Sequence, residues 1–182
     1  LERVNLNPAR FDVKKCTAIN GDWIRYLAID DLVERLVPYL QRDGVIGSTP
    51  SAEDMNLVRA VMPLISERLE TLGQASVMVG FLFTDDIAID AGDAEKIMGD
   101  QADDVLRAAE AALAGLDEWT TEVIERALRA ALIEERGLKP KVAFGPVRLA
   151  ITGRRVAPPL FESMELLGAE RSLSRIRSLH AS

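Results

Sequence analysis

Apolar residues recur at helical spacing along most of this chain. Between residues 29 and 41 they follow one another at intervals of three or four, which places them on one helix face: Leu32, Val33, Leu36, Tyr39 and Leu40. Similar spacing recurs at 51–62, 101–116 and 120–132. The pattern predicts an all-α fold.

Small polar residues precede several of these helices. Asp12 lies near the start of a short helix over 11–20. Thr49-Pro50-Ser51 and Thr120 or Thr121 would cap two later helices, because side-chain oxygens there accept hydrogen bonds from free backbone N–H groups.

Prolines and glycines should interrupt or end the helices. Because proline removes a helix hydrogen bond, we expect Pro38 to kink or restart its helix and Pro63 to break the next one. Gly137 should end the helix that begins near residue 120. From residue 144 onward the chain is cut into short helical pieces by Gly145-Pro146, Gly153, Pro158-Pro159 and Gly168.

One acidic stretch, residues 85–92, lacks helical spacing and separates a compact apolar helix over 76–83 from the Ala-rich helix over 101–116. We therefore expect two helical subdomains, at 29–84 and 93–182, joined by this linker and preceded by the end of another region at 1–28. The aspartates of the linker lack the spacing of a calcium loop, so solvation is the better interpretation of Asp85, Asp86, Asp90 and Asp93.

Composition excludes several classes of protein. Of the 182 residues, 48% are hydrophobic and 28% charged, as in ordinary soluble domains. No apolar run reaches the roughly 18 residues of a membrane span, and the first residues do not form a signal peptide. A single cysteine, Cys16, excludes an internal disulfide and fits the cytoplasm. The single histidine, His180, cannot anchor a metal site or a catalytic triad, so we expect no bound metal. Because no apolar run is long enough to span a membrane, we expect no membrane partner either.

The net charge of −7 conceals a division along the chain. Residues 1–125 hold 11 Lys and Arg against 24 Asp and Glu, whereas residues 126–182 hold 11 against 5. Such asymmetry indicates a nucleic-acid or membrane face. Because salt screens charges over about 10 Å, a local basic surface keeps its attraction within an acidic molecule.

The last forty residues carry six arginines and no lysine. Arginine combines a rigid fork of donors with a flat stacking face, which suits phosphates and unpaired bases. This favours a surface that faces RNA. Arg171, Arg175 and Arg177 lie on the last helix, where we expect them to be exposed to solvent.

Several motifs resemble, in order, the C-terminal part of bacterial glutamyl-tRNA synthetases. The first motifs resemble the junction after that family's catalytic and stem-contacting portions: Phe11-Asp12-x-x-Lys15, Asn20 and Trp23-Ile24-Arg25. Glu67-Arg68-Leu69 resembles the helix entering its first anticodon subdomain. The second subdomain is resembled by Trp119-Thr120, Arg129, Pro146-x-Arg148-x-Ala150-x-Thr152-Gly153, Pro158-x-Leu160-Phe161 and Leu166-Leu167-Gly168. Their combined order and spacing make the match specific.

The resemblance implies the anticodon-binding region of a class I ligase that attaches glutamate to tRNA(Glu) with ATP. The family's HIGH-like and Lys-Leu-Ser-Lys-type signatures do not occur here, so no catalytic residue is expected in this chain. ATP and Mg²⁺ would act in the catalytic domain outside it. The chain would be inactive alone, and we expect a monomer that binds tRNA(Glu) and not DNA.

Five residues match the family's contacts with the anticodon. Arg68 matches the arginine that discriminating members place against the third base, a cytosine in tRNA(Glu) and a guanine in tRNA(Gln). Guanidinium donors can meet the O2 and N3 acceptors of cytosine, whereas guanine presents donors there. Arg129 and Arg148 match contacts with the middle and first bases, and Pro158 and Leu160 match contacts beside the first base.

Other basic residues have no matched role. Arg154 and Arg155 are candidates for contacts with the tRNA backbone, as are Lys14 and Lys15 for the tRNA stem, and simple solvation is the alternative for all four.

Three bulky or reactive residues have structural interpretations. Cys16 and Trp23 are expected to pack in the protein and not to act in redox chemistry or base stacking. Trp119, just ahead of a helix, should fasten that helix to the core.

Two other functions remain open. The parent enzyme could be a non-discriminating ligase that also charges tRNA(Gln), which aminoacylation of both tRNAs would decide. Alternatively, the chain could be a helical protein-interaction module whose basic face binds an acidic partner. Binding that ignores the anticodon sequence would favour that alternative.

Overall fold

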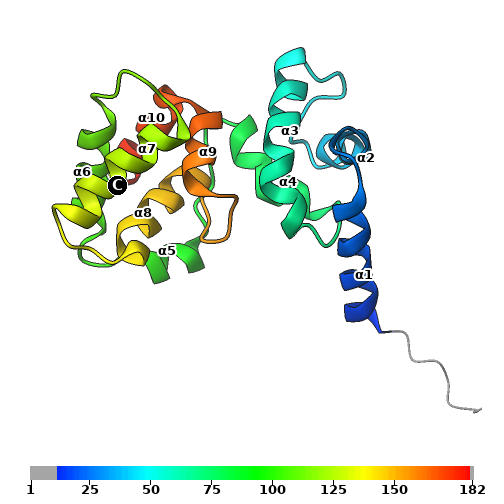
Figure 1. Ribbon diagram of the computed structural model, residues 1–182, viewed down its shortest axis with the longest axis horizontal. Helices are drawn as coiled ribbons and strands as arrows, with labels where there is room; N and C mark the ends of the chain where they lie inside the picture. The colour runs from blue at the N-terminus through cyan, green and yellow to red at the C-terminus, as the bar shows by residue number, and fades with distance from the viewer. Residues whose placement is uncertain (1–11, 181–182) are drawn as a thin grey trace, which may run out of the picture.

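The computed structural model describes residues 12–180, which form helices and no strand, so the all-α prediction is confirmed. Figure 1 shows the helices in two groups, α1–α4 on the right and α5–α10 on the left. The first group comprises α1 (Val13–Tyr26), α2 (Ile29–Arg42), α3 (Ala52–Ile65), the 3-10 turn η1 (Ser66–Arg68), α4 (Gln74–Val79) and the 3-10 turn η2 (Gly80–Phe83).

The second group begins inside the predicted linker over 85–92, because α5 starts at Ala91 and so includes the last two residues of that linker. It comprises α5 (Ala91–Ile97), α6 (Ala102–Leu113), α7 (Thr121–Leu128), the π-helical turn η3 (Arg129–Glu134), α8 (Pro140–Thr152), α9 (Leu160–Leu167) and α10 (Ala169–His180). The subdomain boundaries remain a prediction. Phe11, the rest of 1–11 and residues 181–182 lie outside the described part of the chain.

Side-chain caps begin α1, α3 and α7 at residues that the sequence indicates. The Asp12 carboxylate accepts a hydrogen bond from the backbone N–H of Lys15 at 3.1 Å. Ser51 forms a capping box with Asp54 at the start of α3, and the Thr120 hydroxyl accepts from Val123 at the start of α7. These bonds satisfy backbone donors that the first turn of a helix leaves free.

Three helices continue through prolines at which the local chemistry predicts a kink or a break. α2 continues as one helix through Pro38, α3 continues past Pro63 to Ile65, and α8 runs through Gly145-Pro146. The predicted breaks at Pro63 and Gly145-Pro146 are therefore wrong. A helix interrupted there would lose apolar burial on both sides: Met62 and Ile65 are fully buried, as is Val147 beside Pro146. That burial outweighs the lost backbone hydrogen bond.

The three arginines of α10 differ in burial, contrary to the expectation that all three are exposed. Arg175 is 6% exposed and donates hydrogen bonds to the carbonyls of Ile151, at 2.7 Å, Phe81, at 2.8 Å, and Thr84. Burial, followed by the like charge of Arg171, lowers the pKa of Arg175 to about 10. Three acceptors around one guanidinium explain how a charge is retained inside the protein.

The other two arginines of α10 serve different contacts. Arg171 is half-buried and donates to the carbonyl of Leu82 at 2.9 Å. Arg177 is exposed, and its Nε lies 2.6 Å from a carboxylate oxygen of Glu110 on α6. Arg171 and Arg175 together fasten α10 to the chain that leaves the first helical group.

The segment after η2 is also tied to the end of α8. The backbone N–H of Asp90 donates to the carbonyl of Gly153 at 2.9 Å. Gly153 has φ +73°, and a Cβ placed there would lie 2.5 Å from the carbonyl oxygen of Ala88. Glycine is required at this position because its φ is left-handed and because another backbone approaches it closely.

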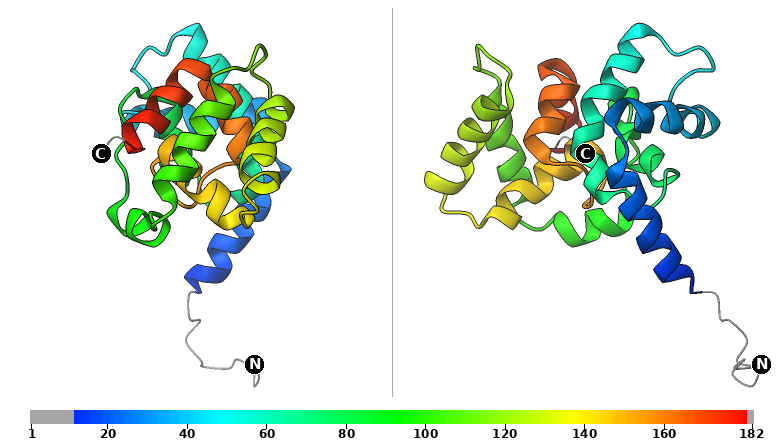
Figure 2. Two further views of the ribbon diagram at one scale, coloured as in Figure 1. Left: turned by 90° about the vertical axis from the view of Figure 1, so that its left-hand side faces the viewer. Right: turned by 45° about the vertical axis from the view of Figure 1, so that its right-hand side comes forward.

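Two packing expectations on α1 are wrong. Cys16 is exposed, and Trp23 is 69% exposed, because α1 extends away from the other helices (Figure 2). By contrast, Trp119 is held as expected: it packs against the core and its indole N–H donates to the carbonyl of Met164 in α9 at 2.8 Å.

Candidate nucleic-acid interface

Two arginines from different helical groups converge on one loop. η1 ends at Arg68, whose Nη1 donates to the carbonyl of Ala157 at 2.8 Å. Arg148, in α8, donates through Nη1 to the next carbonyl, that of Pro158, at 2.7 Å. Each guanidinium carries several N–H donors, and these bonds use one nitrogen of each. The remaining donors are available to a ligand beside the loop.

The two guanidinium groups also repel each other. Arg148 is half-buried, and its pKa is lowered first by burial and then by the positive charge of Arg68, with Glu162 acting in the opposite direction. A ligand that offers lone pairs or negative charge would therefore be stabilised between them.

Pro158, in this loop, and Leu160, the first residue of α9, contribute less side-chain surface than the resemblance implies. Pro158 is buried, and Leu160, 3% exposed, belongs to the hydrophobic core. The exposed apolar residue of this loop is Val156, at 71% exposure, which the sequence analysis did not single out.

Arg129 lies at the junction of α7 and the π-helical turn η3. Its Nε is 2.6 Å from a carboxylate oxygen of Glu125, and its guanidinium lies over the ring of Phe144, 5.8 Å from the centroid. Phe144 stands one turn before Arg148 on α8 and meets Phe161 edge to face, with centroids 5.4 Å apart. Arg129, Phe144 and Arg148 thus lie along one side of the domain.

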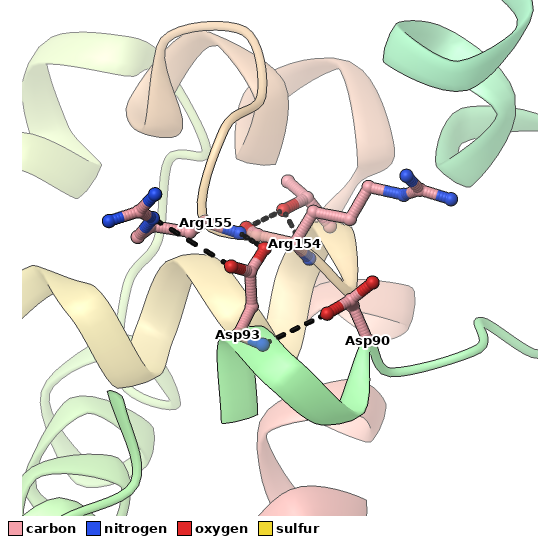
Figure 3. Close-up of polar contacts among 5 residues, drawn as sticks. Asp90, Asp93, Arg154 and Arg155 are labelled. Atoms are coloured by element: carbon pink, nitrogen blue, oxygen red, sulfur yellow. Dashed lines mark hydrogen bonds and ion pairs between the residues drawn. The ribbon is translucent and has the colours of Figure 1, made fainter. Parts of the chain in front are cut away.

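Arg155 is held by Asp93, whereas the side chain of Arg154 is not held by a polar contact within the described residues (Figure 3). The backbone N–H of Arg155 donates to Asp93 at 2.8 Å, and its side-chain Nε lies 3.7 Å from the same carboxylate. Asp90 caps α5 by accepting from the N–H of Asp93 at 2.9 Å. In Figure 3 the Arg154 side chain points away from both carboxylates, and within 12–180 its guanidinium has no polar partner.

The two predicted stem-contacting lysines lie elsewhere. Lys14 and Lys15 are exposed on α1, which Figure 1 places at the opposite side of the molecule from α8. The structure does not bring them to the arginines.

The described residues provide neither a metal site nor a membrane-spanning helix. No group of three or more His, Cys, Asp or Glu side chains within 12–180 could hold a metal ion. None of the helices in this part of the chain is long and apolar enough to cross a membrane.

Comparison with known proteins bears on this surface. The sequence model of a family described as "Anticodon binding domain" matches residues 31–179. The chain belongs to this anticodon-binding family. The arginines and loop residues of this candidate interface lie inside the matched range, whereas Lys14 and Lys15 lie outside it.

This anticodon-binding domain also has close curated relatives. It is 54% identical over 177 residues to a glutamate–tRNA ligase of Saccharopolyspora erythraea and 53% identical over 180 residues to that of Kineococcus radiotolerans. These alignments cover 97% and 98% of this chain but 35% and 36% of the relatives. The chain thus spans about a third of the length of the ligases that it matches.

A solved structure supports the fold. A glutamate tRNA ligase from Elizabethkingia meningosepticum, crystallised in complex with its amino acid, superposes with a TM-score of 0.78 over 95% of this chain and 33% of its own. Because sequence identity is 19%, this likeness concerns the fold alone.

Proposed function

We propose that this anticodon-binding domain recognises tRNA(Glu) as part of a glutamate–tRNA ligase. Arg68, Arg129 and Arg148 contact the third, middle and first anticodon bases, and the backbone at Pro158 and Leu160 borders the first base. The ligase chemistry, with ATP and Mg²⁺, belongs to the part of such an enzyme that this chain does not include. The domain acts in the cytoplasm as a monomer.

One observation carries this proposal: Arg68 and Arg148 hold consecutive carbonyls of one loop and keep donors free. A splayed RNA base needs hydrogen bonds on its edge and a flat partner for its face, and arginine supplies both. The loop fixes each guanidinium before RNA arrives, so less side-chain freedom is lost on binding.

Phosphate contacts complete the assignment. The free guanidinium of Arg154 and the partly exposed one of Arg155 lie in the loop that leads to Ala157, where they would neutralise the RNA backbone. Lys14 and Lys15, on a separate helix, would contact the tRNA stem. Contacts with phosphate add affinity without sequence preference.

The first test is binding of the 182-residue chain to the anticodon stem-loop of tRNA(Glu), followed by fluorescence anisotropy at low salt. We expect binding that weakens when the third anticodon base is changed from cytosine to guanine. Arg68→Ala should abolish this preference, and Arg35→Ala, which removes an exposed charge on α2, should retain it. Binding equal for every anticodon would contradict the proposal and favour a protein-interaction module.

The second test concerns the range of substrates. In the whole ligase, aminoacylation of tRNA(Glu) and tRNA(Gln) should differ strongly, and Arg68→Ala should reduce the difference. Equal charging of both tRNAs by the unmutated enzyme would identify a non-discriminating ligase. A DNA stem-loop of the same sequence and sedimentation of the free protein test the RNA preference and the monomeric state.

A further inference from the structure

A pocket of about 840 Å³ opens between the end of α5, the start of α6 and one side of α8. This volume is in the usual range of small-molecule sites. Four cationic side chains line it, namely Lys96, Lys141, Arg148 and Arg155, against one carboxylate, Asp100. Of these four cations, only the two arginines were candidates from the sequence.

The two lysines come from helices that meet at this pocket. A Cβ placed on Gly145 of α8 would lie 3.4 Å from Cγ2 of Ile97, so the end of α5 lies directly against α8 there. Lys96 precedes Ile97. Lys141, Gly145 and Arg148 are spaced by four and three residues, which aligns them on the same side of α8. Lys96 and Lys141 therefore lie on adjoining walls, and Arg148 lines the same cavity.

The lysines have no acidic partner in this part of the protein. Both are exposed, and neither makes an ion pair or side-chain hydrogen bond within residues 12–180. α8 begins without a side-chain cap, and no acceptor within 12–180 meets the backbone N–H of Lys141 in its first turn. The positive end of the helix dipole thus adds to the side-chain charge.

The cavity also has an apolar wall that suits a nucleoside. Val142, 41% exposed, and Phe144 line it beside the cations. A cavity with a cationic rim and a partly aromatic wall is complementary to a nucleotide, whose phosphate is anionic and whose base is flat.

We propose that Lys96 and Lys141 bind the phosphate of an anticodon-loop nucleotide whose base lies against the α8 wall of this pocket. The proposal rests on the function proposed above and adds two backbone contacts to it. These contacts position the loop and carry no base preference, because a phosphate is the same in every nucleotide. A free nucleotide offers the same chemistry, so the test must separate the two sources.

The test compares the double variant Lys96→Ala/Lys141→Ala with the control Arg35→Ala/Arg107→Ala, which removes two exposed charges outside the pocket. Binding of the tRNA(Glu) anticodon stem-loop is measured over a range of salt concentrations. The slope of log K against log salt is negative, and each lost contact with single-stranded RNA reduces its magnitude by about 0.7. We therefore expect the magnitude to fall by about 1.4 in the lysine variant. Its affinity should fall several-fold and by a similar factor for every anticodon.

The possible outcomes are distinct. If the wild-type chain does not bind the stem-loop, the proposed function itself fails. If it binds but both double variants behave alike, the lysines are not phosphate contacts and this inference is overturned. Titration with cytidine monophosphate provides the other arm: lysine-dependent binding of the free nucleotide, with stem-loop binding unchanged, would overturn the RNA assignment. Circular dichroism checks that both variants remain folded.

Discussion

Arg68 and Arg148 donate hydrogen bonds to the consecutive carbonyls of Ala157 and Pro158, although the two arginines are eighty positions apart in the sequence. The loop is thus held from two sides, by the end of η1 and by α8. This arrangement joins the first helical group to the second at the proposed RNA surface. A substitution of either arginine should alter the position of the other, because they share the loop and repel each other.

Arg148→Ala should weaken discrimination at one anticodon base by about 1–3 kcal/mol, as base-reading arginines generally do. Arg154→Ala is the matched control from the same surface, because its free guanidinium is assigned to phosphate. That variant should weaken binding by a similar factor for all anticodons. Anisotropy titrations with stem-loops altered one base at a time measure both effects. A uniform loss for Arg148→Ala would reassign it to the backbone.

Arg175→Met should lower the free energy of unfolding by about 3 kcal/mol. The substitution retains an apolar stem but removes the donor from the carbonyls of Ile151, Phe81 and Thr84, the first two of them in buried hydrogen bonds. Charged buried hydrogen bonds are costly to lose. Arg177→Met, on the same helix, removes an exposed ion pair and should cost no more than about 1 kcal/mol. Urea denaturation followed by circular dichroism compares the two. Similar losses would show that the buried contacts of Arg175 add no net stability.

Gly153→Ala should destabilise the fold by at least about 2 kcal/mol, because a left-handed φ and a backbone clash both oppose the methyl group. Gly137→Ala is the control: its φ is +65°, but nothing lies within 4 Å of an added Cβ. It should cost only the backbone term of about 1 kcal/mol. Thermal unfolding of both variants measures the difference, and equal losses would mean that the chain at Ala88 moves aside.

Glu110→Gln should reduce stability in a pH-dependent manner. Hydrogen bonds from Arg177 and then His180 lower the pKa of the Glu110 carboxyl below its ordinary 4.5. A lowered pKa in the folded state stabilises the fold above the unfolded pKa, and this stabilisation is lost as pH falls through the folded value. The difference in melting temperature between wild type and variant should be present at pH 7 and decrease toward pH 3.

Glu118→Gln is the control for that measurement, since Glu118 is exposed and has no polar partner within residues 12–180. Its melting temperature should follow the wild type across the same range of pH. If the Glu110→Gln difference does not change between pH 7 and pH 3, the carboxylate charge does not contribute to holding α10 against α6.

Local chemistry predicted much of the helical framework. Caps at Asp12, Ser51 and Thr120 were readable because a cap depends on a few consecutive residues. Gly153 and Gly168 ended helices as expected, with φ of +73° and +86°. The break predicted at Pro63 is wrong, because the burial that carries α3 past it comes from packing against other helices, including α2 and α9.

The candidate site was predicted only in part. The order of arginine motifs singled out Arg68, Arg129 and Arg148 as candidates, but it could not indicate that Arg68 and Arg148 hold the same loop. The motifs also placed Leu160 at a ligand, whereas the fold buries it in the hydrophobic core at 3% exposure. Lys96 and Lys141 carried no local signal, since an exposed lysine near a helix end is common.

By itself, the sequence determined the all-α class, the basic second half and the membership of an anticodon-binding family, because helical spacing, charge and motif order are properties of the chain. Only the tertiary structure decided that Arg175 is buried, that Arg177 on the same helix is exposed, and that two lysines share a pocket with Arg148. These properties depend on which helices meet. Burial and electrostatic environment arise from contacts between distant segments, and no local pattern specifies them.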